Sequence, residues 1–438
     1  MQSKQVIRNY QLIAGIYTLS ASLIWGVNTL FLLNAGLDIF SVFIVNSVFT
    51  GAMALFEIPT GVLADTRGRR ISFLLSVIIV LLGTLGYIWA AQMGGSLLLF
   101  SAMSVILGLG YTFYSGAVEA WLVDALIATN YEGELDRVFA RGSMVSGAAM
   151  LIGTTLGGLL GSIDLAFPYW GRAVLLAIVF VISYFTMHDL GFEPRTLKLT
   201  ALPAEMIKIA RSSITYGWKE RPMRLFMMVS FLQSGFMAWG FYAWQPYFLD
   251  LLGRDAVWVA GGVAALIALS TIIGNSLVEW FSRYCGKRTT LLLWASGALT
   301  VSAIGVGLAQ SFWVAVALFL IGTAATGVIG PVKQGFLHKI IPSEQRASVI
   351  SFDSLVGSSG SVFGQTGLGY LSKVRSIAEG YMVGSLINLF ALPVIFLIRR
   401  LDESADNIVG KCGKQGASAG QGLPEVSTVD ATPRQAES

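Results

Sequence analysis

Charged side chains are scarce in this sequence. Only 12% of its 438 residues are charged and 55% are hydrophobic, whereas an average soluble domain is ~25% charged. So few charges cannot cover the surface of a water-soluble particle of this size. The composition therefore predicts a polytopic membrane protein embedded in a lipid bilayer. Its net charge of +4, carried in short loops, gives no indication of nucleic-acid binding.

Cysteine and histidine are nearly absent as well. The two cysteines, Cys285 and Cys412, fall in segments expected to be cytoplasmic, so a structural disulfide is not expected. The histidines, His188 and His338, form no metal-type cluster in the sequence. No nucleophile–base arrangement stands out, and no Gly-x-x-x-x-Gly-Lys-Ser/Thr phosphate loop occurs. We therefore expect no enzyme activity, no metal, no cofactor and no ATP-driven transport.

Long apolar runs are what the chain has in abundance. Runs of roughly 20 apolar residues are long enough to cross a bilayer. A backbone in hydrocarbon must satisfy its polar groups internally, so each run is expected to be a helix. The first run is too long for a signal-peptide core and is expected to be retained. The predicted spans are residues 12–34, 39–62, 71–92, 97–122, 142–163, 168–187, 224–249, 256–280, 289–309, 312–336, 347–371 and 379–398.

The longest internal polar stretch, residues 188–223, separates six predicted spans from six. We therefore expect an all-α fold of twelve transmembrane helices in two pseudo-symmetric six-helix bundles, residues 1–187 and 224–400, joined by a cytoplasmic loop. A weak internal repeat agrees, since Glu119 aligns with Lys333 near the ends of the fourth and tenth spans. Residues 401–438 are polar and have no apolar period, which predicts a disordered cytoplasmic tail.

Lysine and arginine predict the orientation. On the side opposite the termini we place only Arg172, Arg254, Lys373 and Arg375, and Lys333 falls within a span. The other 24 of the 29 lysines and arginines lie on the side of the termini. Because cytoplasmic loops carry the excess of positive charge, both termini are expected in the cytoplasm, and the protein in the inner (plasma) membrane.

The stretch GVLADTRGRR, residues 61–70, follows the second predicted span. It resembles the signature loop of the major facilitator superfamily, which reads Gly-x-x-x-Asp-x-x-Gly-Arg-Arg/Lys, with Thr66 where the family usually has arginine. The resemblance implies a twelve-span secondary transporter of bacterial type, in which Asp65 binds the other half at the cytoplasmic face and stabilises the outward-open state. Alternatively, the arginines only anchor the topology. The gating motif comprises Gly61, Asp65, Arg67, Gly68, Arg69 and Arg70, and its glycines are expected to allow close helix approach and a tight turn.

Charges inside spans are costly and usually face a cavity or a partner. The candidates for coupling or gating are Glu57, Glu119, Lys333 and Asp353. We expect Glu119 and Lys333 to form an ion pair that closes the cytoplasmic side and breaks when that side opens, with local pairing at the membrane interface as the alternative. The membrane carboxylates also make protons a candidate coupling ion.

Polar and aromatic side chains at mid-depth are the candidates for a substrate cavity. Aromatic faces with a few amides suit an amphiphilic or cationic organic solute, although the same residues also fit simple packing or an interfacial belt. The candidates are Asn28, Tyr111, Tyr114, Gln233 and Trp239. In the fifth span, Gly153, Gly157 and Gly158 are expected to allow close helix packing.

These features together predict a monomeric secondary transporter of a small organic solute that works by alternating access, with proton-coupled efflux by an antiporter as one form. The alternatives are uptake or facilitated diffusion of a sugar, amino acid or organic acid, and a transporter-like receptor that moves no solute.

Overall fold

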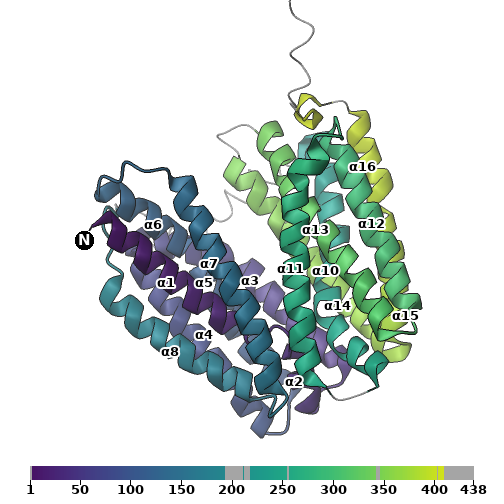
Figure 1. The fold of residues 1–438 in the computed structure, drawn as a ribbon, viewed down its shortest axis with the longest axis horizontal. Helices are drawn as coiled ribbons and strands as arrows, with labels where there is room; N and C mark the ends of the chain where they lie inside the picture. The colour runs from purple at the N-terminus through teal and green to yellow at the C-terminus, as the bar shows by residue number, and fades with distance from the viewer. Residues whose placement is uncertain are drawn as a thin grey trace, which may run out of the picture.

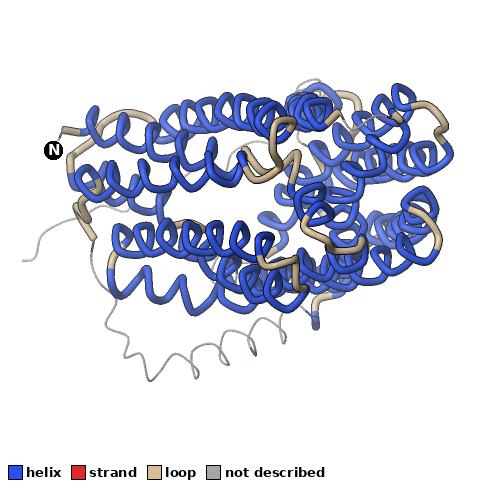
Figure 2. The backbone as a smooth tube through the Cα atoms, turned by 90° about the horizontal axis from the view of Figure 1, so that it is seen from below, coloured by secondary structure: helices blue, strands red, loops and turns tan. Residues whose placement is uncertain are grey.

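The computed structural model describes residues 2–192, 211, 218–253, 256–341, 346–401 and 403–408, and these are almost entirely helical (Figure 1). Short loops join the helices, as Figure 2 shows from below. The helices are α1 (Ser3–Ser22), α2 (Asn28–Asn34), α3 (Ile39–Arg67), α4 (Arg69–Gln92), α5 (Leu97–Tyr114), α6 (Ala117–Ala128), α7 (Leu135–Gly161), α8 (Phe167–Thr186), α10 (Arg221–Leu252), α11 (Val257–Ser282), α12 (Arg288–Leu308), α13 (Phe312–Ile340), α14 (Arg346–Val374), α15 (Ile377–Leu389), α16 (Ala391–Arg400) and the short 3₁₀ helix η2 (Ser404–Asp406).

The helices form two bundles, each around its own apolar core. Helices α1–α8 make the first bundle, and its buried core runs from Val6 to Met187. Helices α10–α16 make the second bundle, whose core runs from Met223 to Ala405 and also takes in Phe43 of α3. Most of the predicted linking loop over 188–223 lies outside the described residues, so its boundaries stay a prediction.

Ten helical stretches in the described part of the chain are long and apolar enough to cross a membrane. Two further stretches are more polar. Helices α1 and α2 together lie where the sequence predicts the first span, and α14 lies where it predicts the eleventh. Both pack closely against the other helices, α1 on α7 and α14 on α10. Their polarity follows from this packing, because their polar side chains can turn toward protein rather than lipid.

Three of the predicted spans are interrupted, which the hydropathy pattern did not indicate. The chain leaves the helix between α1 and α2, at Gly116 between α5 and α6, and at Phe390 between α15 and α16. Gly116 has a φ of +72°, a left-handed conformation that glycine adopts without strain. At the α1–α2 break the side chain of Gln245 accepts a hydrogen bond from the Thr29 amide at 2.9 Å and donates to the Trp25 carbonyl at 2.8 Å. The freed backbone groups are thus satisfied by a side chain of the other bundle.

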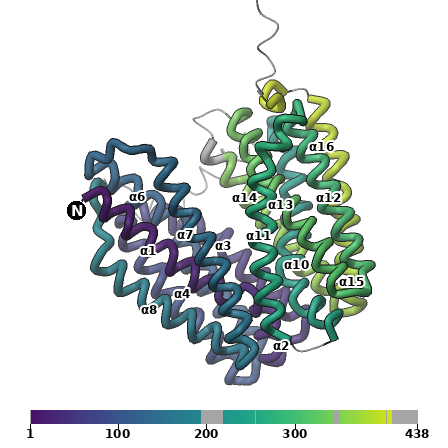
Figure 3. Tube along the Cα trace, in the orientation of Figure 1, coloured from purple at the N-terminus to yellow at the C-terminus, as the bar shows by residue number. Residues whose placement is uncertain are grey.

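The two bundles meet at one end of the molecule and diverge toward the other (Figure 1). We call the end that holds Ser3 and Arg400 the terminus end, and the opposite end, near α2, the far end. Contacts between the bundles run mainly from α3 to α14 and from α7 to α11. The molecule is therefore V-shaped and open at the terminus end (Figure 3).

The first residues of the predicted disordered tail are ordered. Residues 403–408 fold against α12, and the buried Asp406 carboxylate accepts hydrogen bonds from the Thr289 amide and hydroxyl, each at 2.7 Å. The prediction of disorder from residue 401 is wrong for this segment, because a single acid satisfies the free amide at the start of α12. Residues 409–438 lie outside the described residues.

Candidate functional site: a cavity between the bundles

The far end is held closed by hydrogen bonds between the bundles. Besides the two bonds of Gln245, the Thr29 hydroxyl donates to the Tyr242 carbonyl at 3.0 Å, and the Gln365 amide donates to the Thr50 hydroxyl at 3.2 Å. At the outer edge Lys373 donates to the Asp38 carboxylate at 2.8 Å. This ion pair, helped by the Ser41 amide, lowers the pKa of Asp38 from its ordinary value. Polar contacts thus contribute to the closure, together with the packing of α3 on α14 and of α7 on α11.

Small residues on α7 allow close approach at two helix crossings, one between the bundles and one within the first bundle. On α7, a Cβ atom at Gly158 would lie 2.5 Å from the Cα of Gly261 on α11, in the other bundle. At Gly153 and Gly157 a side chain would collide with α1, against Ser22 and the Leu23 carbonyl. The three glycines predicted to serve helix packing therefore lie where backbones touch, and Gly158 faces across the two bundles.

A cavity of about 220 Å³ lies between the first bundle and α10. It contains two of the predicted substrate residues, Asn28 and Tyr111. Tyr169 donates to the Asn28 side-chain oxygen at 2.8 Å, and Asn28 in turn donates to the Asn46 oxygen at 3.2 Å. The Nδ2 group of Asn46 is buried and has no hydrogen-bond partner in the structure. The cavity lining consists of Ile24, Trp25, Asn28, Asn46, Phe49, Met53, Tyr87, Leu107, Tyr111, Arg172, Phe241 and Tyr242.

Arg172 is a buried cation in this cavity, which the count of charges by side did not indicate. It lies in the second turn of α8 with only 2% of its surface exposed. Its guanidinium donates to the Tyr111 hydroxyl at 3.0 Å and lies 5.7 Å from the centre of that ring. Its Nε is buried without a partner, and no ion pair joins it to a carboxylate in the described residues.

Helical spacing contained the signal that counting charges overlooked. Tyr169, Arg172, Leu176, Val179 and Ser183 are all buried and recur every three or four residues along α8. They form one face turned toward the bundle interior. A cation on that face points away from the lipid, and charges within spans usually face a cavity or a partner because they are costly in hydrocarbon. Arg172 was therefore a candidate for a site, and sequence pattern alone could have identified it.

The second bundle contains a separate, polar cavity of about 530 Å³ toward the terminus end. There Lys333 of α13 forms an ion pair with Asp353 of α14 at 2.6 Å and a short hydrogen bond with Ser230 of α10. Ser230 also donates to the other Asp353 oxygen at 2.6 Å. Three helices of one bundle thus share a buried charge pair that lines a cavity.

The predicted pair of Glu119 and Lys333 is not formed in this conformation, which is open at the terminus end, so the pair stays a prediction for the closed state. Lys333 has its acid partner within its own bundle, and Glu119 lies in the other bundle with an exposed side chain. The physical reason is that the bundles are separated at this end. The helices α6 and α13 are therefore not among the pairs of described elements that pack closely. Glu57 is also exposed on α3, and the structure brings it into neither cavity.

The signature loop is anchored within the first bundle. Asp65 forms an ion pair with Arg69 at 2.6 Å, and the Arg70 amide donates to the Asp189 carboxylate at 2.8 Å. Gly68 has a φ of +110°, and a side chain there would collide with Asp189. The predicted tight turn therefore lies at Gly68. Nothing approaches the position of a Cβ at Gly61, so the close helix approach predicted there does not occur in this conformation.

The remaining predicted residues lie away from the central cavity. Tyr114 stacks on Tyr17 with ring centres 4.0 Å apart, and Arg67 is exposed at the end of α3. In the second bundle Gln233 donates to Ser296 at 2.8 Å, and Trp239 packs between Phe43 and Tyr381. Both are buried polar or aromatic residues whose contacts are structural.

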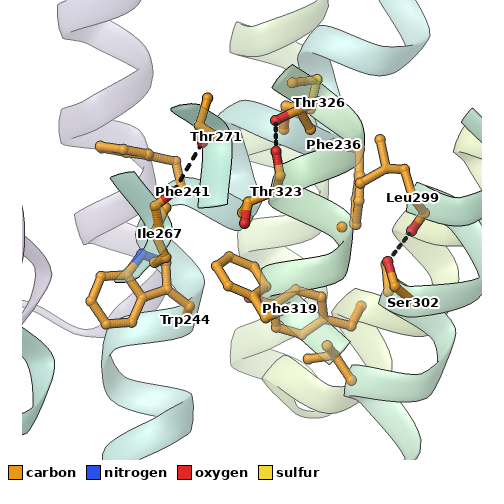
Figure 4. A pocket seen from close by; sticks show the side chains of 16 residues that line it. Phe236, Phe241, Trp244, Ile267, Thr271, Leu299, Ser302, Phe319, Thr323 and Thr326 are labelled. Carbon is orange, nitrogen blue, oxygen red and sulfur yellow. Dashed lines mark hydrogen bonds between the residues drawn. The ribbon is translucent and has the colours of Figure 1, made fainter. Parts of the chain in front are cut away.

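An apolar cavity of about 200 Å³ lies beside them in the second bundle (Figure 4). Its walls include Phe236, Trp244 and Phe319. The hydroxyl groups of Ser302 and Thr326 bond to carbonyls of their own helices, at 3.0 Å and 2.7 Å (Figure 4). This cavity therefore offers little polar recognition, in contrast to the one that contains Arg172.

Comparison with known proteins gives a consistent result. The family model described as Major Facilitator Superfamily matches residues 12–365 and 260–413. A curated relative, the uncharacterized MFS-type transporter YxaM of Bacillus subtilis (strain 168), is 22% identical over 396 residues, which cover 86% of this chain and 91% of the relative.

Solved structures share the fold. The nucleoside transporter NupG is similar with a TM-score of 0.73 at 12% identity, over 91% of this chain and 99% of that one. A POT family transporter in complex with a thioalcohol-conjugated peptide is similar with a TM-score of 0.66 at 13% identity, over 90% of this chain and 96% of that one. At these identities the likeness concerns the fold.

Proposed function

Because the chain belongs to the major facilitator superfamily and is a secondary transporter of small solutes, we propose that it works by rocking its two bundles about the central cavity. The observation that carries this proposal is the asymmetry between the two ends. The described hydrogen bonds between the bundles come from the far-end half of the molecule, and the bundles diverge at the terminus end (Figure 3). Alternating access requires such a state and its opposite.

We place the terminus end in the cytoplasm and the protein in the inner membrane, so that this conformation is inward-open. The excess of lysine and arginine in the loops at that end supports the placement. The signature loop fits the same view. In the inward-open state Asp65 is engaged with Arg69 of its own bundle, and closing the terminus end would bring the loop toward the other bundle.

We propose that the ion pair of Lys333 and Asp353 couples transport to protons. An acid and a base buried together in a span usually mark an ion pathway or a switch. Here they line the cavity nearest the open end and are linked by Ser230 to a third helix. Protonation of Asp353 would remove the charge that holds Lys333, so the packing of α10, α13 and α14 would respond to pH.

The rocking motion can be tested by cross-linking in proteoliposomes. In a background with Cys285 and Cys412 replaced by serine, Asp38→Cys and Lys373→Cys are joined by a short cleavable bismaleimide. We expect flux of labelled test solutes (an aromatic acid, an amino acid, a sugar and an amphiphilic amine) to stop on cross-linking and to return on cleavage. Flux that continues with the far end locked would contradict the proposal, and no flux of any solute would favour a receptor.

A matched control pair lies within one bundle. Glu134 and Arg137 are exposed and three residues apart near the start of α7, so cross-linking cysteines at these positions should leave flux unchanged.

Proton coupling is tested with Asp353→Asn, which should abolish flux driven by a pH gradient but retain solute exchange. Asp250→Asn, at an exposed acid, is the control. Wild-type flux that does not depend on the pH gradient would refute proton coupling. If flux does depend on it, the direction of net solute movement under a known gradient gives the direction of transport.

A further inference from the structure

We propose that the central cavity binds the oxyanion group, carboxylate or phosphate, of a small aromatic solute, with Arg172 as its anchor. The inference rests on the proposed transport function, because it names the substrate class of that same cavity. It also differs from the amphiphilic or cationic solute that the sequence suggested. The chemistry of the lining residues carries it.

The first observation is the unbalanced charge of Arg172. A guanidinium has five N–H donors and no acceptor. In the described residues it donates only to the hydroxyl of Tyr111, a neutral group, although it is 98% buried in α8. A buried cation is normally paired with an acid. Since the described residues supply none in the cavity wall, an anionic ligand fits as its partner.

The second observation is that the other polar groups of the cavity are also donors. Tyr169 donates to the Asn28 oxygen, and Asn28 donates to the Asn46 oxygen, so these two bonds orient both amide groups. The Nδ2 group of Asn46 is then left as a buried donor without a partner among the described residues. The Tyr111 hydroxyl accepts from Arg172, so its own proton is free to donate into the cavity. Two independent buried side chains, Arg172 and Asn46, therefore lack an acceptor. An oxyanion supplies several acceptors at once.

The third observation concerns the body of the ligand. The remaining wall is aromatic or aliphatic, with Trp25, Phe49, Tyr87 and Phe241 among its members. A volume of about 220 Å³ is small, below the ~300–1,000 Å³ typical of sites for drug-sized ligands. A flat ring with one acidic group fits both the volume and the lining. A cationic solute would face Arg172 without any acid to compensate.

Binding to the purified full-length protein tests the inference without requiring transport. The probes are benzoate, phenyl phosphate, inorganic phosphate, benzamide and benzylamine, at constant ionic strength, with affinity measured by thermal shift and isothermal titration. We expect benzoate or phenyl phosphate to bind and the neutral and cationic analogues to fail. The stronger of the two anions identifies the acidic group.

The variants are Arg172→Gln, Arg172→Lys and Asn46→Leu, with Arg283→Gln as the matched control, because Arg283 is exposed and paired with Glu279. We expect Arg172→Gln to weaken binding by about 10- to 100-fold, as for loss of hydrogen bonds to a charged group. Arg172→Lys should restore part of the affinity, and Arg283→Gln should have no effect. If Arg172→Gln does not fold, Arg172→Lys and Asn46→Leu carry the test, each with a measurable loss.

The outcomes separate the two proposals. Anion binding that is lost in the Arg172 variants supports the inference, even if proteoliposomes show no flux, in which case the transport mechanism fails instead. Binding of benzamide or benzylamine in place of the anions overturns the inference, as does anion binding that is unchanged in Arg172→Gln. Binding of inorganic phosphate alone, or of none of the probes, also overturns the aromatic-acid assignment.

Discussion

Replacing Gly158 by alanine should shift the protein away from the conformation described above. The new Cβ would lie 2.5 Å from the Cα and 2.8 Å from the nitrogen of Gly261. Carbon atoms in contact prefer about 3.5–4.0 Å, so α7 and α11 must separate by about 1 Å. Overpacking of this kind costs about 1–3 kcal/mol, which corresponds to about a 5- to 150-fold change in the equilibrium between the two states.

The neighbouring Gly262 provides the control. A Cβ there would meet nothing within 4 Å, so Gly262→Ala on α11, the helix that crosses α7 at Gly158, makes the same type of substitution without the collision. The readout is the distance between spin labels at Arg137→Cys and Lys339→Cys, two exposed sites at the terminus ends of the two bundles. We expect Gly158→Ala to populate a shorter distance and Gly262→Ala to match the unsubstituted protein. Equal behaviour of the two variants would refute the role of the glycine crossing.

Three further predictions follow from single contacts. Because Lys373 lowers the pKa of Asp38, the stabilisation from this pair is present above the ordinary carboxyl pKa of about 3.9 and is lost as pH falls through the lowered value. With Asp38 and Lys373 unchanged, the far-end contact should therefore weaken in that acidic window, by no more than about 1 kcal/mol because the pair is half exposed. The distance between spin labels at Arg137→Cys and Lys339→Cys reports the shift, and Asp38→Asn should remove its pH dependence. Lys333→Met alone should destabilise by about 3–5 kcal/mol and Lys333→Met with Asp353→Leu by much less, as judged by thermal unfolding, and equal losses would contradict a buried pair. Gly68→Ala should lower stability and yield, by about 1–3 kcal/mol, since it forces a side chain onto Asp189 at a φ of +110°; a normal melting curve would count against the turn.

Hydropathy determined the membrane class, the order of the spans and the two six-span halves, because each depends only on local composition. The comparisons confirm the superfamily that the loop at residues 61–70 predicted. The sequence also indicated Asn28 and Tyr111 as cavity residues, and both line the central cavity. For Asn28 the reason is that an amide in a span needs a partner.

Tertiary structure alone decided which side chains meet. Lys333 aligns with Glu119 in the repeat, yet it pairs with Asp353, because the bundles have separated at that end and only the helices of its own bundle are within reach. The break between α1 and α2 exists because Gln245, more than two hundred residues away in the chain, satisfies its backbone. The helical spacing of α8 can indicate that Arg172 is buried, but only the tertiary structure shows that its partner is the Tyr111 hydroxyl and not an acid. Local patterns fix which segments are buried, whereas the partner of a buried charge depends on how distant helices cross.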